Sequence, residues 1–521
     1  MKHYSEYRTK HTWTDAALAL LLALLLFFLA FLTLDSGNRF SSDDYAAYML
    51  SGFSIAEGTF DQQNRINRIF HPTAMPLEAA GSEELVYPWG YPLLLAPIYR
   101  LAGFDRTDYH SMVYYTLPGA AAFAAAGGLL FLFYRRRMGT VCSFVLALLC
   151  CLSQQLFSLV GNIQTDVVFM AMCMLIYWLT EVFLARPERR IPLGILLGAA
   201  MWFTYELRLN GFTICLLAGL AHLIFALRSR KEDEKPPFWQ QLLPYAVFGV
   251  LTLVFDHLIF SPATPNTSDF VRITGAQVLK NAGSYWKMIQ EWLGTLWFAG
   301  PLEGLNGLPA VLLTLALMAV GIAAHGLRHN LHLTLLLIGT FAALLFLPYT
   351  QGVRYFINVM PLGLLFAALG LQWLWGLISR RWKPGAVRWI AAAFCGLMLI
   401  CGACTLLDTG AEALEQYRRR GDPKPATDAY TDDAISMYHY IMDNTAEDCT
   451  IAFLKPRCLY LNTQRLAFNP AVNDHSIDDA DYFLVFNKRG QGGLMEGKDY
   501  FEAVYGNDLL TLYANRQRVA Q

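Results

Sequence analysis

A series of about eleven long apolar runs constrains this 521-residue chain more than any other feature. A helix rises about 1.5 Å per residue, so roughly 20 apolar residues cross the hydrocarbon core of a bilayer. The first run, Ala16 to Thr33, exceeds a signal-peptide core and has no small-residue cleavage site beside it, so we expect a retained span. The expected spans are 16–33, 111–134, 141–158, 163–184, 190–207, 209–228, 240–260, 308–327, 331–349, 355–378 and 387–407.

The composition agrees with a membrane protein. Hydrophobic residues make up 55% of the chain and charged residues only 16%, whereas about a quarter of the residues in a soluble domain are charged. The formal net charge is -1, so the chain lacks the basic footprint of a nucleic-acid-binding protein.

The basic residues set the orientation. With the N-terminus in the cytoplasm, the opposite short connections carry only Arg208 and Arg354. Since cytoplasmic loops are enriched in lysine and arginine, this asymmetry supports both the span count and a cytoplasmic N-terminus in the cell (inner) membrane. An odd number of spans then places the tail outside. The cytoplasmic set is Lys2, Arg8, Lys10, Arg135, Arg136, Arg137, Arg186, Arg189, Arg190, the Arg228–Lys235 loop, Arg328 and the Arg380–Arg388 loop.

The expected fold is therefore mainly α: a polytopic membrane domain, 1–407, and a small extracytoplasmic α/β domain, 408–521. The membrane domain has two long external loops, 35–110 and 261–306. Weakly apolar pieces lie at 45–56 and 87–102. The second is rich in proline, which predicts an interfacial helix rather than a span. In the tail, residues 431–443 read as a helix, and 450–454, 482–486 and 509–513 alternate as strands do.

Ten cysteines give no metal-binding spacing. Eight lie within apolar runs, where cysteine is a small hydrophobic residue. Cys449 and Cys458 lie in the tail and could pair outside the cell.

Charged residues on the outer side are the candidates for chemistry. Asp43 and Asp44 follow two serines and precede a helical pattern, so helix capping is favoured over catalysis on the local pattern alone. Asp166 begins the fourth span, where function and favourable placement at a helix N-terminus are equally good readings. Arg208 and Arg354 break the positive-inside trend, and a guanidinium fork suits a phosphate, although either arginine alone could reach headgroups by snorkelling.

Together these residues predict an external pocket of carboxylates and guanidinium groups that handles a lipid phosphate. Glu206 is expected to pair with Arg208. His71 and His257 also lie near this face and have no assigned role.

The order of these motifs resembles the C-superfamily (GT-C) glycosyltransferases, in the bacterial branch related to protein O-mannosyltransferases and to the aminoarabinose transferase of lipid A. The resemblance covers nearly the whole chain. It rests on Asp44-x3-Tyr48-x9-Gly58, on Tyr87-Pro88-Trp89-Gly90-Tyr91-Pro92, on Asp166, on Arg354-Tyr355-Phe356 with Pro361, and on Lys455–Tyr460 with Gln464-Arg465. Two departures are Tyr45, where many relatives have a second acid, and Trp89, where they have proline.

The resemblance implies an inverting transfer of a hexose-type sugar from a polyprenyl-phosphate donor to an external hydroxyl of an envelope glycopolymer, lipid or protein. Asp44 is then the expected general base, with Asp43 as the second candidate and Asp166 as the group that orients the acceptor or supports the site. Arg354 and Arg208 would bind the donor phosphate. The aromatic residues expected to line the pocket are Tyr48, Tyr87, Tyr91 and Tyr355.

No cofactor is expected. Three nearby acids allow a divalent metal, but no ligand spacing supports one. The alternative functions are a transporter or lipid flippase, a scaffold that binds cell-wall polymer, and a multi-span acyltransferase. A transporter predicts acids at mid-membrane and paired broken helices, and no histidine-centred motif supports an acyltransferase.

Overall fold

The computed structural model describes residues 12–34, 43–60, 62–63, 88–106, 111–228, 237–260, 274–298, 303–304, 306–327, 330–346, 352–382, 384–421, 429–470, 477–488, 495 and 497–519. Within this part of the chain, each expected span contains a helix. These helices are α2 (Trp13–Thr33), α6 (Met112–Arg135), α7 (Thr140–Leu152), α9 (Asp166–Ala185), α10 (Arg190–Leu207), α11 (Gly211–Arg228), α12 (Phe238–Val254), α14 (Leu308–Gly321), α16 (Leu331–Leu345), α17 (Met360–Ser379) and α18 (Pro384–Arg418).

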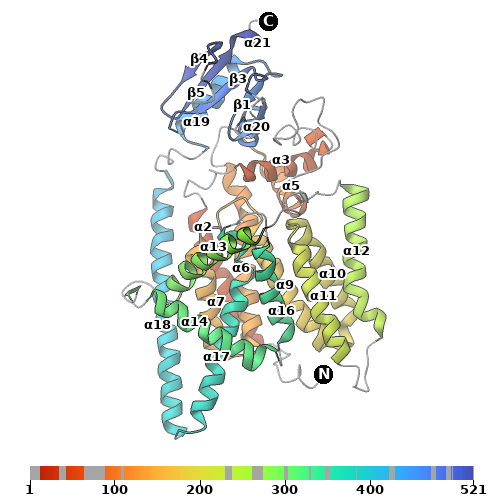
Figure 1. The fold of residues 1–521 in the computed structure, drawn as a ribbon, viewed down its shortest axis with the longest axis vertical. Helices are drawn as coiled ribbons and strands as arrows, with labels where there is room; N and C mark the ends of the chain where they lie inside the picture. Colours follow the sequence, from red (N-terminus) through yellow and green to blue (C-terminus); the bar gives the residue numbers. More distant parts are fainter. Residues whose placement is uncertain are drawn as a thin grey trace.

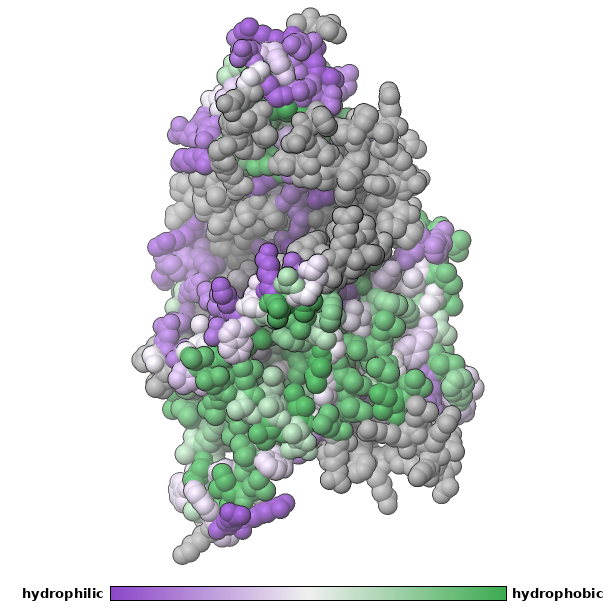
Figure 2. Space-filling view, viewed as in Figure 1, coloured by the Kyte–Doolittle hydropathy of each residue, from purple (hydrophilic) through white to green (hydrophobic). Residues whose placement is uncertain are grey.

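Seven described helices are long and apolar enough to cross a membrane: α2, α6, α9, α12 with the π-helical turn η5 (Phe255–Ile259), α14 with η8 (Ile322–Gly326), α17 and α18. α7, α16 and part of α11 are shorter apolar helices. Large apolar side chains on these helices face outward, among them Leu24 and Phe28 on α2 and Val250 on α12, each nearly 60% exposed (Leu24 59%, Phe28 58%, Val250 58%). Figure 2 shows them as a continuous apolar surface over the helical part, with hydrophilic residues over the C-terminal domain.

Two span boundaries differ from the prediction. Ser153 adopts an extended ψ of 136° and ends α7 at Leu152, so the expected span 141–158 is divided into α7 and the short α8 (Gln154–Phe157). The last span does not end at residue 407, because α18 continues as one helix to Arg418 and rises toward the C-terminal domain (Figure 1).

Close helix packing in the membrane domain depends on glycine. α14 and α17 touch at Gly321 and Gly370, where an added Cβ would lie 1.9 Å from the carbonyl oxygens of Phe366 and Leu317, respectively. Small residues at such crossings let the backbones of membrane helices approach closely.

Three helices lie beside the spans rather than among them: α3 (Asp44–Glu57), α5 (Gly90–Ala102) and α13 (Gly275–Thr295). α3 and α5 come from the first long loop and pack on each other between the spans and the C-terminal domain (Figure 1). α13 lies within the second long loop, 261–306. The segment 87–102, which was expected to form a helix other than a span, contains α5.

The C-terminal domain is the expected small α/β unit. It contains α19 (Asp432–Asn444), β1 (Thr450–Ala452), α20 (Pro456–Thr463), β2 (Leu466–Phe468), β3 (Tyr482–Phe486), β4 (Phe501–Gly506), β5 (Leu510–Asn515) and α21 (Arg516–Val519). The sheet order is β2-β1-β3-β5-β4. β1 pairs in parallel with β2 and β3, while β5 pairs antiparallel with β3 and β4. β1, α20 and β2 form a βαβ unit, and α20 is the helix that contacts α3.

Candidate functional site

Four charged side chains from separate parts of the sequence meet where the spans end beneath α3. Asp44 is the first residue of α3, Asp166 is the first residue of α9, Arg208 follows α10, and Arg354 lies in the 3-10 turn η9 (Val353–Tyr355) before α17. We call these four residues the charge quartet. Two carboxylates at helix N-termini are favourably placed, because unpaired backbone N–H groups carry partial positive charge there.

Asp166 is the buried centre of the charge quartet. Its side chain is only 1% exposed, and its Oδ1 accepts from Arg208 Nη2 at 2.5 Å and from Arg354 Nε at 3.3 Å. A buried carboxylate is stable only when it is paired and hydrogen-bonded. Asp166 therefore fixes the positions of both arginines.

The guanidinium group of Arg208 forms nearly all of its interactions with other groups of the protein. Its Nε donates to Thr165 Oγ1 at 2.7 Å, Nη1 donates to the Arg354 carbonyl at 3.4 Å, and its guanidinium lies 4.5 Å from the centre of the Tyr355 ring. With Asp166 on Nη2, all three nitrogens have partners, and the side chain is 7% exposed. The geometry suits holding Asp166 and η9 in place better than binding a ligand.

Arg354 is the accessible cation of the charge quartet. It bridges the two acids, donating through Nε to Asp166 and through Nη1 to Asp44 Oδ2 at 3.3 Å. Arg354 and Asp44 are both partly exposed, at 29% and 26% of their side-chain surfaces. Burial disfavours the charge on Arg354, but Asp166 and Asp44 outweigh burial and raise the pKa of its guanidinium above the ordinary value. Its charge is therefore permanent.

The carboxylate of Asp43 has different hydrogen-bond partners from the carboxylate of Asp44. Its carboxylate accepts from the backbone N–H groups of Cys458, at 2.8 Å, and Arg457, at 3.3 Å, in the first turn of α20. It makes no side-chain cap on α3, the helix that it precedes. The prediction that Asp43 caps the helix it precedes is therefore wrong, because the carboxylate instead accepts from the first turn of α20, in the C-terminal domain. Burial raises the pKa of Asp43 despite the opposing effects of Arg457 and these N–H groups.

Three of the four expected tyrosines line this region. Tyr48 lies one turn after Asp44, hydrogen-bonds Thr165, and meets Tyr91 of α5 edge to face with ring centres 5.3 Å apart. Tyr355 lies against both arginines. Tyr87 and His71 lie outside the described residues.

Gly90 explains why α5 can enter so close to the charge quartet. A Cβ there would lie 2.7 Å from the backbone carbon of Glu206, at the end of α10. Only glycine allows α5 to begin against the strand-like turn that carries Arg208. Close packing of α5 against the end of α10 therefore explains the glycine in the Trp89-Gly90-Tyr91 motif.

One nearby residue, Glu206, differs from expectation. Glu206 does not pair with Arg208, because its carboxyl group hydrogen-bonds Asp256 of η5. His257 follows Asp256 on the same turn and is not part of the charge quartet. Thr165 and Phe169 of α9, which contact Arg208, were missed because uncharged residues at a span end give no distinguishing signal.

Among the described residues, no group of three or more histidine, cysteine or acidic side chains is arranged to hold a metal ion. The position between Asp44 and Asp166, where a cation would bridge two carboxylates, holds the guanidinium of Arg354.

Solved structures share the fold of this chain over nearly its whole length. ArnT from Cupriavidus metallidurans, bound to undecaprenyl phosphate, superposes with a TM-score of 0.56 at 14% identity, covering 96% of this chain and 97% of ArnT. The chain has the fold of this ArnT structure. The archaeal oligosaccharyltransferase AglB from Archaeoglobus fulgidus, in complex with an inhibitory peptide and a dolichol-phosphate, gives a TM-score of 0.55 at 11% identity, with 91% of this chain and 69% of AglB covered. No family model matches the sequence, and no curated protein does.

Proposed function

We propose that this membrane protein is a glycosyltransferase that moves a hexose-type sugar from a polyprenyl-phosphate donor to a hydroxyl group of an envelope glycan, lipid or protein. The observation that carries the proposal is the partly exposed pair of Asp44 and Arg354, held from behind by buried Asp166 and Arg208. The two solved GT-C structures that contain undecaprenyl phosphate and dolichol-phosphate support a lipid-phosphate donor.

Asp44 and Arg354 suit the two requirements of a displacement reaction, which are activation of the nucleophile and stabilisation of the leaving group. The Asp44 carboxylate accepts the proton of the acceptor hydroxyl while that oxygen forms a bond to the anomeric carbon. The bond from the anomeric carbon to the phosphate oxygen breaks, and its electrons stay on the lipid phosphate. Arg354 stabilises this leaving group, and preorganised charge of this kind is most effective in a site that excludes water. Direct displacement inverts the anomeric centre.

Arg354 also couples binding of the donor phosphate to the release of Asp44 as the base. Its Nη1 donates to Asp44, and an incoming phosphate is a stronger partner for a guanidinium fork than a single carboxylate oxygen. Donor binding would therefore draw Nη1 toward the phosphate and release Asp44 to act as a base. Asp166 keeps Nε in place throughout.

The proposed chemistry needs no divalent metal, because Arg354 supplies the cation between the two acids. We expect turnover to survive treatment with EDTA and to gain nothing from added Mg²⁺ or Mn²⁺. Loss of most activity on chelation, with recovery on adding back one metal, would contradict this assignment.

The test of the function is donor consumption by the purified protein. Radiolabelled polyprenyl-phosphate hexoses are supplied with crude envelope acceptors, and transfer and slow donor hydrolysis are both followed. The wild type should consume at least one donor, and Arg354→Ala should weaken donor binding more than Arg354→Lys, which keeps the charge but loses the fork. If no donor binds or reacts, the proposal fails and transport assays follow.

A further inference from the structure

A second polar cavity lies along α3, away from Asp44. It has a volume of about 180 Å³ and is bounded by α3, the end of α5 and α20 of the C-terminal domain. Glu57 lines the cavity and is the last residue of α3. It comes thirteen residues after Asp44, a separation of roughly 20 Å along a helix. The cavity is thus separate from the charge quartet but on the same helix.

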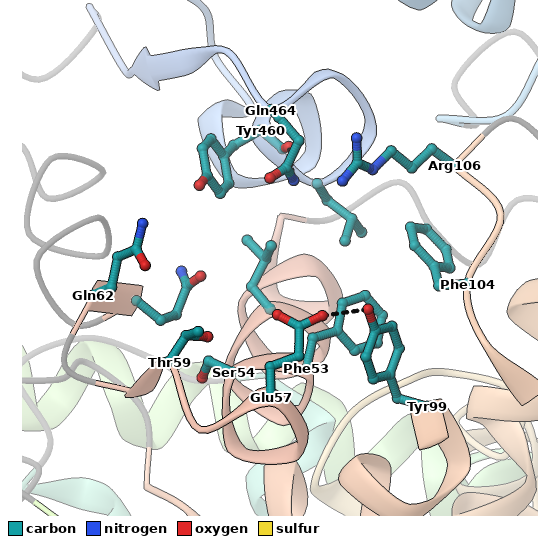
Figure 3. Close-up of a pocket in the computed structure, with 13 residues that line it drawn as sticks. Phe53, Ser54, Glu57, Thr59, Gln62, Tyr99, Phe104, Arg106, Tyr460 and Gln464 are labelled. Atoms are coloured by element: carbon teal, nitrogen blue, oxygen red, sulfur yellow. Dashed lines mark hydrogen bonds between the residues drawn. The ribbon is translucent and has the colours of Figure 1, made fainter. Parts of the chain in front are cut away.

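The groups in the cavity are those that recognise hydroxyl groups. Figure 3 shows Glu57, Gln62 and Thr59 on one side and Gln464 on the other, with Arg106 reaching in from beside Phe104. Carboxylate, amide and guanidinium groups supply both acceptors and donors at short range. Leu50, Leu461 and Phe104 add apolar surface beside these polar groups.

Aromatic rings complete the lining. Tyr99 donates to Glu57 Oε1 at 2.5 Å and stacks on Phe53 with ring centres 4.1 Å apart, so the carboxylate is held in one position. Tyr460 of α20 lies opposite, beside Gln464 (Figure 3). Flat aromatic surfaces beside polar groups suit a ligand that has both C–H faces and hydroxyl groups.

Gln464 gives an independent reason to assign a function. It ends α20 with φ 57° and ψ 18°, and it is the one non-glycine residue with positive φ in the described part of the chain. Glycine or asparagine is usual at this position, because a Cβ in the left-handed conformation is costly. Strained residues of this kind gather at ligand sites. Here the strained residue lines the cavity, and its amide Nε2 donates to the carbonyl of Tyr460 at 3.2 Å.

We propose that this cavity binds a saccharide portion of the acceptor, remote from the hydroxyl that reacts. The inference rests on the proposed transferase function and extends it: the acceptor is an oligosaccharide or glycan rather than a free small molecule. The cavity joins the membrane domain to α20, so a glycan bound here contacts both domains while its reactive end lies at Asp44.

The test uses the full-length protein and fluorescently labelled oligosaccharides released from the envelope of the source organism by mild acid. Binding is measured by fluorescence anisotropy without donor. Gln464→Gly removes the amide and also relieves the backbone, so we expect about tenfold weaker binding, as for one lost hydrogen bond, with no fall in Tm. Glu57→Gln should also weaken binding. Glu447→Gln, an exposed acid elsewhere in the C-terminal domain, is the matched control and should bind normally.

Three outcomes would overturn the inference: no binding by the wild type, wild-type binding by both cavity variants, or binding that is lost in Asp44→Asn and kept in Gln464→Gly. The assay contains no donor, so it separates the two proposals. Oligosaccharide binding at the cavity in a protein that consumes no polyprenyl-phosphate sugar would refute the transferase function and leave this site standing.

Discussion

Neighbouring residues in this chain have unlike surroundings. Asp43 and Asp44 are adjacent, yet one caps a helix of the C-terminal domain and the other pairs with Arg354. The sequence could not separate them, because the partners of Asp43 lie more than 400 residues away. Asp44, Asp166, Arg208 and Arg354 were nevertheless all predicted from their outer position, and the structure brings them together. Whether Arg208 or Arg354 remains accessible to a ligand depends on tertiary packing, which a local sequence pattern does not show.

The contact between the two domains can be tested through the reactivity of one thiol, that of Cys458. The structure has Cys449 and Cys458 as free thiols, and Cys458 Sγ lies 3.0 Å from the hydroxyl of Tyr45 on α3. Burial raises the pKa of the Cys458 thiol to about 11, and alkylation requires the thiolate. Native protein at pH 8 should therefore leave Cys458 unlabelled by iodoacetamide, with reactivity rising only as the pH approaches that value.

Mass spectrometry after unfolding supplies the control, since both tail cysteines should then react without a reductant. Rapid labelling of Cys458 in the native protein would show that α20 is not docked on α3. Labelling that requires a reductant would show that the two cysteines are paired.

At the scale of elements, the helices were more predictable than their ends. Hydrophobic runs located the spans, but Ser153 divides one of them and α18 continues past residue 407. β2, β4, α20 and α21 were missed. β2 has only three residues, which is too short for alternation to be distinguished from chance. α20 begins within Lys455–Tyr460, a segment that the family resemblance marked but whose periodicity did not indicate a helix.

The approach of α5 to α10 is an element-scale contact that can be tested. Gly90→Ala places a Cβ within 2.8 Å of three backbone atoms of Glu206 and Leu207, so α5 must move and carry Tyr91 away from Tyr48. Overpacking of this kind costs about 1–3 kcal/mol. Thermal unfolding should show a lower Tm, with reduced turnover.

Gly283→Ala on α13 is the matched control, because nothing lies within 4 Å of its Cβ position. There the higher helix propensity of alanine should keep or raise the Tm. Equal Tm values for both variants would show that α5 does not approach α10 as described.

At the scale of the whole molecule, two buried ion-pair clusters lie at opposite ends of the helical domain. The charge quartet occupies the end beneath α3. Glu181 on α9, with Arg136, Arg137 and His332, forms a second buried cluster near the opposite ends of α6 and α16. The arginines that set the orientation in the sequence are therefore partly structural, and a buried pair of this kind is costly to break.

The proposed orientation predicts which surfaces an impermeant reagent can reach. Glu447→Cys, in the C-terminal domain, should react with a membrane-impermeant maleimide in intact cells or spheroplasts. Trp382→Cys, in the turn before α18 and 51% exposed, should react only after permeabilisation. The reversed pattern would place the charge quartet in the cytoplasm and remove the case for an external acceptor.

The assignment of Asp44 as the base is the central claim, and the most direct measurement is the turnover of Asp44→Asn beside Asp43→Asn in one purified preparation. General-base removal costs about 10²–10⁴-fold in rate. Asp44→Asn should therefore lose kcat by that factor while donor affinity stays within a few-fold, and Asp43→Asn should keep near-normal kcat with a lower Tm for the C-terminal domain. Wild-type turnover in Asp44→Asn, or an equal loss in both variants, would contradict the account.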